Sequence, residues 1–459
     1  MGVQLIRADE ALTPRPIWCV TPQNWREVAG GLPAPALAFG EATGFKAEAG
    51  ALLVLPAADG AIAGVLFGCE GSPRDPLTFG RLATTLPAGD YAIAHPPADP
   101  RLAALGFLLG GYRFTRYGKR PVADVRLVVP DGTDEAYLRR TAEAVALTRD
   151  LVNTPANDLG PAEIEAAVRA LASRFGAQVE VTSGDDLLAA NFPLIHAVGR
   201  ASPRAPRLID LSWGDPGAPK VTLVGKGVAF DTGGLDIKPS SGMLLMKKDM
   251  GGAANAIGLA QMIMARALKV RLRLIVPAVE NSIDGSAFRP GDVFASRKGL
   301  TVEIGNTDAE GRLILADALS LADEEAPELL IDFATLTGAA RVALGPQLPP
   351  AYTGDDTLAA DLARHGAAEA DPSWRMPLWP PYASMLDSRI ADLNNAPSGG
   401  FAGSITAALF LQRFVTRAGA WLHLDIFAWN PTTRPGRPEG GEAQTIRALD
   451  ALIAERYGA

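Results

Sequence analysis

The sequence has 459 residues, a length that predicts two or three domains. Hydrophobic residues make up 48% of the chain and charged residues 20%, which is enough apolar material for a large globular core. The formal net charge of -8 argues against nucleic acid or an anionic membrane as the main partner, because both attract basic surfaces.

The first part of the chain, residues 1–132, is expected to form a small α/β domain. Short apolar strands at 51–55 and 61–67 alternate with Gly and Pro turns, and 125–130 is expected to be the last strand. Apolar residues at helical spacing follow and predict a connecting helix over 133–152.

The rest of the chain, residues 153–459, is predicted to form a larger α/β domain with a central mixed sheet flanked by helices. A loop signal at 153–157 precedes strands that alternate with helices. The predicted strands are 179–181, 206–213, 220–230, 270–280, 301–305, 329–335 and 421–427, and the predicted helices are 158–175, 251–268, 313–324 and 404–415. In such sheets, ligand sites lie in loops at the carboxyl ends of strands.

Three polar loops, at 225–239, 246–252 and 305–312, are each interpreted as following an apolar strand. In the third loop Asp308 and Glu310 stand two residues apart, so in an extended backbone their carboxylates would point the same way. They would repel each other unless cations lay between them, and two divalent ions about 3.5–4 Å apart are one arrangement that satisfies both. Asp231 and Asp249 would complete an oxygen-rich shell.

Oxygen ligands suit Mg²⁺ and Mn²⁺, and Zn²⁺ also accepts them. One acidic loop is most often simply solvated, but three such loops together favour a metal site. Other catalytic patterns fail, because the sequence has no H-E-x-x-H, no Walker A loop and no G-x-S-x-G. The four histidines are isolated in the sequence and are expected to be structural: His95, His196, His365 and His423.

The features that bear on location are few. Two cysteines, Cys19 and Cys69, make no disulfide framework and fit a reducing compartment. The N-terminus has no basic stretch followed by an apolar run, so no signal peptide is expected. The apolar stretch at 102–111 is about half the ~20 residues that span a bilayer. We therefore predict a cytoplasmic protein without membrane contact.

The string N-T-D-A-E-G-R-L at 306–313 resembles the signature of the leucine aminopeptidase family, also called cytosol aminopeptidases. The segments V-G-K-G-x-x-F-D-T-G-G-L-D-I-K-P at 224–239 and M-K-K-D-M-G-G-A-A at 246–254 are similar to other family segments. Shorter matches stand at 153–157, 334–339 and 403–411. The resemblance covers residues 150–459, whereas the N-terminal domain matches in general layout, with G-Y-R-F-x-x-Y at 111–117 as a local match.

The resemblance implies a two-metal aminopeptidase that holds Mn²⁺ or Zn²⁺, with Mg²⁺ or Co²⁺ as further options. Asp231 and Glu310 would bridge both ions, and Asp249 with Lys226 would serve the exchangeable one. Lys238 and Arg312 would be catalytic without binding metal, and Arg312 would hold a bicarbonate that shuttles protons. The metal ligands implied by position are Lys226, Asp231, Asp249, Asp308 and Glu310.

The implied reaction is hydrolysis of the N-terminal residue of a peptide by a water that the two metals activate. Lys226 can bind a metal only as a neutral amine, so its pKa would have to be pushed far down. Lys238 would stabilise the developing oxyanion, and the bicarbonate on Arg312 would replace the missing histidine as a base. Peptides with a free N-terminus are the implied partners, and the implied assembly is a homohexamer.

The substrate pocket departs from the family pattern. The family typically continues H-L-D-I-A-G where this sequence has Phe427 in place of the Ala, followed by Ala428-Trp429-Asn430. A larger side chain would fill space, so we expect a pocket of altered shape and a changed preference for leucine. The residues expected to line this pocket are Met246, Thr335, Gly338, Phe427 and Asn430.

Two alternatives stay open at this point. Another two-metal hydrolase, such as a phosphoesterase, could use Asp249, Asp308 and Glu310, but a lysine ligand favours the peptidase. A non-catalytic scaffold on the same fold would be expected to have lost ligands, and none is lost in this sequence.

Overall fold

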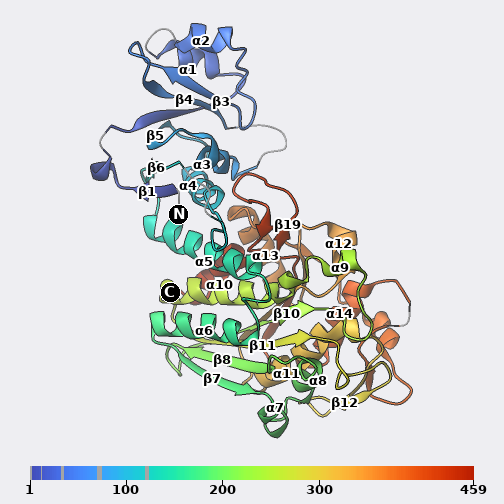
Figure 1. Ribbon diagram of the computed structural model, residues 1–459. Helices are drawn as coiled ribbons and strands as arrows, with labels where there is room; N and C mark the ends of the chain where they lie inside the picture. The colour runs from blue at the N-terminus through green and yellow to red at the C-terminus, as the bar shows by residue number, and fades with distance from the viewer. Residues whose placement is uncertain are drawn as a thin grey trace. The chain divides into compact units, whose positions relative to one another are not determined.

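The structure is a computed structural model that describes residues 3–11, 13–32, 36–69, 75–118, 123–397 and 399–458. The chain divides into two compact units. One comprises Met1–Ala146 with Thr432–Glu439, and the other comprises Leu147–Pro431 with Gly440–Ala459. Both are built from a sheet and helices, so the predicted class of a smaller and a larger α/β part is confirmed (Figure 1).

The first unit is built on a sheet whose described strands run in the order β1-β6-β5-β2-β4-β3. Its strands are β1 (Val3–Ile6), β2 (Arg15–Val20), β3 (Leu52–Pro56), β4 (Ile62–Gly68), β5 (Gly89–His95) and β6 (Val125–Val128). All neighbours are parallel except β3 and β4. The predicted strands 51–55 and 61–67 correspond to β3 and β4, and the apolar stretch near 102–111 is the buried helix α4 (Pro100–Gly110).

The predicted connecting helix is α5 (Glu135–Asn153), and the boundary between the two units falls inside it, after Ala146. The segment 432–439 is grouped with the first unit although its neighbours in sequence belong to the second. The domain limits drawn from the sequence at 1–132, 133–152 and 153–459 stay a prediction.

The second unit holds a mixed sheet in the order β16-β15-β18-β14-β9-β11-β8-β7, with β10 beside β11. The central pairs around β9, β14 and β18 are parallel, whereas β8 is antiparallel to both β7 and β11. Its strands are β7 (Gln178–Ser183), β8 (Arg207–Trp213), β9 (Lys220–Gly225), β10 (Gly227–Asp231), β11 (Arg271–Asn281), β14 (Leu329–Ala334), β15 (Pro350–Tyr352), β16 (Trp374–Arg375) and β18 (Ala420–Asp425).

Helices cover both faces of this sheet (Figure 1). On one face α10 (Gly251–Ala265) packs on β9 and β14, and α6 (Pro161–Phe175) packs on β8. On the other face α11 (Glu310–Glu324) packs on β9 and β11 and contacts α8 (Pro193–Gly199) and α14 (Gly403–Gln412). In the described part of the chain, none of the helices combines the length and apolar character that a bilayer crossing needs.

The single strand predicted over 220–230 is in fact two strands, with Lys226 between them. β9 pairs with both β11 and β14, but β10 pairs only with β11 among the described strands. At the break the Lys226 amide donates to Phe333 O, and Lys226 O accepts from the Ala253 amide. A Cβ on Gly252 would lie 2.2 Å from Phe333 O, so this close packing of the α10 start on the strand ends requires glycine.

A buried ion pair joins α5 to the C-terminal part of the second unit. Arg149 Nη2 lies 3.0 Å from Glu442 Oε1, and both side chains are almost fully buried. We expect Arg149→Met to lower the free energy of unfolding by about 3–5 kcal/mol, because it leaves a buried carboxylate without its charge partner. The matched control is Arg364→Met, whose pair with Glu455 is exposed and should contribute under about 1 kcal/mol. Equal losses in urea titrations of the two variants would contradict this expectation.

Candidate metal centre

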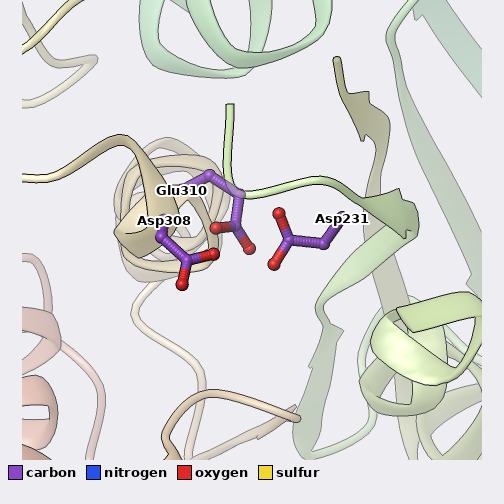
Figure 2. Close-up of side chains that lie close together, drawn as sticks. All are labelled: Asp231, Asp308 and Glu310. Carbon is purple, nitrogen blue, oxygen red and sulfur yellow. The ribbon is translucent and has the colours of Figure 1, made fainter. Parts of the chain in front are cut away.

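Three carboxylates from separate segments meet at one edge of the second unit's sheet. Asp231 ends β10, Asp308 lies in the short 3₁₀ helix η4 (Thr307–Ala309), and Glu310 is the first residue of α11. One oxygen from each lies within 4.8 Å of the other two. Figure 2 shows the carboxylates of Asp231 and Glu310 facing each other, with Asp308 beside Glu310. Such a convergence of like charges is typical of a site that holds cations.

The local backbone differs from the sequence-based expectation in two of the three loops. The loop at 305–312 is not extended, because η4 runs directly into α11, so helical geometry and not strand alternation places Asp308 and Glu310. The segment 246–252 does not follow a strand. It contains the 3₁₀ helix η3 (Met246–Met250), preceded by α9 (Ser240–Met243), and leads into α10.

Asp231 is held in place by donors that sequence reasoning missed. Asn281 Nδ2 donates to Asp231 Oδ1 at 2.9 Å and to Thr307 O at 3.1 Å, and the Gly233 amide donates to the same Asp231 oxygen at 2.8 Å. Asn281 thereby ties the end of β10 to η4. The signal available in the sequence was its position at the end of the predicted strand 270–280.

Lys226 lies among the carboxylates. Its Nζ is 2.8 Å from Asp249 Oδ2 and 2.9 Å from Glu310 Oε1, and the residue is only 3% exposed. Thr335 Oγ1 donates to Asp249 Oδ1 at 2.7 Å and fixes that carboxylate. A Cβ on Gly311 would lie 2.7 Å from Lys226 Nζ, so glycine leaves the room that the lysine needs.

The charges of this centre perturb one another. Burial and the neighbouring Asp231 raise the pKa of Asp308 to about 6 and raise that of Glu310 well above its ordinary value. Burial opposes the charge on Lys226, but Asp249 and Glu310 outweigh that effect and raise its pKa above the usual lysine value. The protein's charges alone therefore keep Lys226 as an ammonium, and only added cations could release it as a neutral amine.

Several buried oxygens of the centre have no hydrogen-bond partner among the described residues. They are Asp249 Oδ2, Asp308 Oδ1 and both carboxylate oxygens of Glu310. Ammonium groups lie close to some of them, but without the directional geometry of a hydrogen bond. Unsatisfied buried carboxylate oxygens that converge in this way fit oxygen-preferring divalent ions. The residues present therefore fit the metals that the sequence predicts.

The two predicted catalytic residues occupy different surroundings. Lys238 Nζ lies 2.8 Å from Asp231 Oδ2 and also contacts Asp308, so it stands at the centre. Arg312 is buried on α11 and donates through Nη1 to Asn395 O at 2.6 Å. Burial lowers the pKa of Arg312 to about 10, which still leaves the guanidinium charged at neutral pH.

A cavity of about 310 Å³ opens beside the carboxylates. Of the predicted pocket residues, Met246, Thr335, Gly338 and Phe427 line it. Asn430 is not among the lining residues and instead donates to Glu442 Oε2, so its side chain serves the buried Arg149 pair.

Two further cationic residues that carried no predicted role also line this cavity, Lys248 and Arg341. Burial lowers the pKa of Lys248 to about 8. Lys248 directly precedes the candidate ligand Asp249, which was the only signal in the sequence that it would lie near the centre.

Comparisons with known proteins agree with this geometry. A family model described as the cytosol aminopeptidase family, catalytic domain, matches residues 146–450, and one described as the M17 aminopeptidase N-terminal domain matches residues 16–130. A probable cytosol aminopeptidase of Xanthobacter autotrophicus is 41% identical over 378 residues, which cover 79% of this chain and 75% of the relative.

Solved structures are similar over nearly the whole length. A crystal structure of a cytosol aminopeptidase from Coxiella burnetii has a TM-score of 0.94 and 46% identity, covering 99% of both chains. The bottromycin maturation enzyme BotP in complex with Mn has a TM-score of 0.85 and 34% identity, covering 97% of this chain and 100% of its own.

Proposed function

This chain belongs to the cytosol aminopeptidase family and is a metal-dependent aminopeptidase that removes N-terminal residues from peptides, and we propose which role each residue of its metal centre has in that reaction. The observation that carries the proposal is the meeting of Asp231, Asp308 and Glu310 beside one cavity, with Lys226 paired to Asp249 and Glu310.

We assign two divalent ions to five ligands. Asp231 and Glu310, whose carboxylates face each other (Figure 2), would hold both ions, as the family resemblance implies. Asp249, Lys226 and Asp308 would hold the exchangeable ion, and the Thr335 hydroxyl orients Asp249. The family binds divalent metal ions, and Mn²⁺ or Zn²⁺ is the assignment that oxygen ligands plus one amine support.

When bound, the two ions would polarise the scissile carbonyl and make water a stronger nucleophile at neutral pH. Lys238 is placed to stabilise the negative charge that develops on that carbonyl oxygen, since its ammonium is held at the centre by Asp231 and Asp308. Without metal, burial opposes the charge on Lys238, but the carboxylates outweigh that effect and raise its pKa above the usual lysine value, so its ammonium is a donor of hydrogen bonds.

We propose that proton transfer uses a small anion bound by Arg312. No histidine is among the described residues that line the cavity. Arg312 keeps its charge and uses Nη1 on Asn395 O, which leaves other guanidinium donors for a small anion. A bicarbonate held there would supply the base.

The family resemblance implies the oligomeric state, the composition indicates the compartment, and the cavity lining indicates the substrate pocket. We propose a homohexamer in the cytoplasm, and a side-chain pocket formed by Met246, Thr335, Gly338 and Phe427. A phosphoesterase on this centre is disfavoured by the lysine among the ligands, and a scaffold role by the complete ligand set.

Removal and return of metal tests the proposal directly. Chelation should abolish the release of nitroaniline from aminoacyl nitroanilides, and Mn²⁺ or Zn²⁺ should restore it, with about two ions bound per chain in metal analysis. Phosphate esters serve as the control substrates and should not be hydrolysed. Full activity after exhaustive chelation, or release of phosphate alone, would reject the assignment.

A further inference from the structure

We propose that the cavity selects peptides whose N-terminal residue is aspartate or glutamate, and that Lys248 and Arg341 determine this specificity. The inference rests on the proposed function, because it takes the cavity beside the metal centre as the place where the first side chain of the substrate binds.

The two cations meet on one aromatic ring. Lys248 comes from η3, Arg341 from α12 (Gly338–Leu344), and Phe427 lies two residues beyond the end of β18. Lys248 Nζ lies 4.6 Å from the centre of the Phe427 ring, and the Arg341 guanidinium carbon lies 5.6 Å from it. Both cationic groups therefore face the same ring at the cavity wall.

Both cations have hydrogen-bonding capacity to spare. Lys248 is only 5% exposed, and its ammonium forms no ion pair or hydrogen bond with any residue that the structure describes. Arg341 uses Nη2 on Asp425, while its Nε and Nη1 are buried and have no partner within the described part of the chain. The two unpartnered guanidinium nitrogens of Arg341 cost free energy in their buried position. A ligand carboxylate in the cavity would give the Lys248 ammonium an acceptor and place a second anion beside Arg341.

Asp425 cannot satisfy both groups, because it is already fully engaged. Its carboxylate accepts from the amides of Leu336 and Thr337, at 3.1 Å and 3.2 Å, and from the Thr337 hydroxyl at 2.5 Å. Ser404 Oγ donates to it as well, at 3.1 Å. Four such donors and Arg341 exhaust the lone pairs of one carboxylate.

The other acids near the cavity are committed to the metal centre. Asp231, Asp249, Asp308 and Glu310 together carry the charge that two divalent ions would neutralise. With those charges balanced, Lys248 and Arg341 leave the side-chain end of the cavity positive. An anionic side chain fits this field, whereas an aliphatic one would bury the Lys248 ammonium without an acceptor and leave Arg341 with Asp425 alone.

The direct test compares isosteric substrates on the metal-loaded full chain. We expect kcat/KM for glutamyl nitroanilide to exceed that for glutaminyl nitroanilide by on the order of 10- to 100-fold, as for a hydrogen bond to a charged group, and to exceed that for leucyl nitroanilide. Aspartyl and asparaginyl substrates form the second matched pair. Calorimetry of free glutamate against free glutamine gives the same comparison at equilibrium, without turnover.

Variants then test whether Lys248 and Arg341 cause the preference for an acidic first residue. Lys248→Met keeps most of the length of the side chain but removes its charge. It should reduce the ratio of kcat/KM for the glutamyl over the glutaminyl substrate at least about tenfold, whereas Lys248→Arg should keep most of that ratio. Lys247→Met is the matched control, because its ammonium binds Asn153 O and does not line the cavity, so its ratio should stay at the wild-type value. Arg341→Met gives the same test if Lys248→Met does not fold.

The outcomes separate this inference from the proposed function. Faster hydrolysis of the leucyl than of the acidic substrates, or an unchanged ratio in both Lys248→Met and Arg341→Met, overturns the acidic preference and leaves the peptidase intact. Absence of metal-dependent release from every substrate overturns the proposed centre instead. In that case the calorimetric comparison still decides the side-chain preference, and equal binding of glutamate and glutamine rejects it.

Discussion

Glu310→Gln is expected to lower kcat/KM by about 10³-fold or more, equivalent to about 4 kcal/mol of transition-state stabilisation. Glutamine has the same shape but lacks the charge and one of the two oxygens that a bridging ligand needs. Metal analysis of the purified variant should show less than the wild-type content. The matched control is Glu324→Gln at the other end of α11, which pairs with Arg297 on the surface and should keep activity within about twofold.

Although Glu310→Gln should lower activity, it should raise the stability of the protein once the metal is removed. Because the folded-state pKa of Glu310 is raised, its ionised form costs stability at any pH above the ordinary glutamate value. The substituted amide carries no charge to repel Asp231, so the chelated variant should unfold at a higher temperature than the chelated wild type. A lower unfolding temperature, or wild-type turnover, would contradict the assignment of Glu310 as a ligand.

The fold class followed from the sequence because long apolar strands alternate with helices, and that pattern depends on burial alone. The limits of the strands at the metal centre could not be predicted from the sequence. The apolar run 220–230 gives no sign of its break, where Lys226 O accepts from the Ala253 amide of α10, a contact from another segment. The strands β1 and β5 are not predicted individually, since their stability comes from pairing with neighbours and not from local pattern.

The metal centre, too, could be predicted only in part. The spacing of the acidic residues indicates cations, and the family motif indicates which residues are ligands. The extended loop predicted for Asp308 and Glu310 is wrong, because the structure has a 3₁₀ turn entering α11. Asn281 and Thr335 act on ligands through hydrogen bonds from other segments. Such partners are defined only by tertiary contacts.

The pocket was the least predictable part. Phe427 was recognised as a departure from the family, but its effect was expected to be steric. The structure places Lys248 and Arg341 against its ring, so the departure is electrostatic as well. Neither cation is close to Phe427 in sequence, which is why no motif could show that the three meet. Asn430 next to this strand faces Glu442 instead.

Lys226→Met should also abolish most activity, by at least about 10²-fold, yet its stability effect should be opposite in sign to that of Glu310→Gln. In the chelated protein the ammonium of Lys226 balances Asp249 and Glu310 at 2.8 Å and 2.9 Å. Its removal leaves buried carboxylates without a partner, which costs about 3–5 kcal/mol. Because those carboxylates raise the pKa of Lys226, this contribution is fully present below the ordinary value of 10.5 and is lost only at higher pH.

Thermal unfolding with and without chelator separates the two roles of this lysine. As an ammonium it stabilises the metal-free protein, and as a neutral amine it would serve as a ligand, so Lys226→Met should unfold earlier than wild type when chelated and should gain less stability from Mn²⁺ than wild type gains. Lys220→Met, on the same segment but bonded to Glu325 O, is the control and should respond to metal as wild type does. If Lys226→Met binds two ions with wild-type affinity, Lys226 is a charge partner of Asp249 and Glu310 and not a ligand.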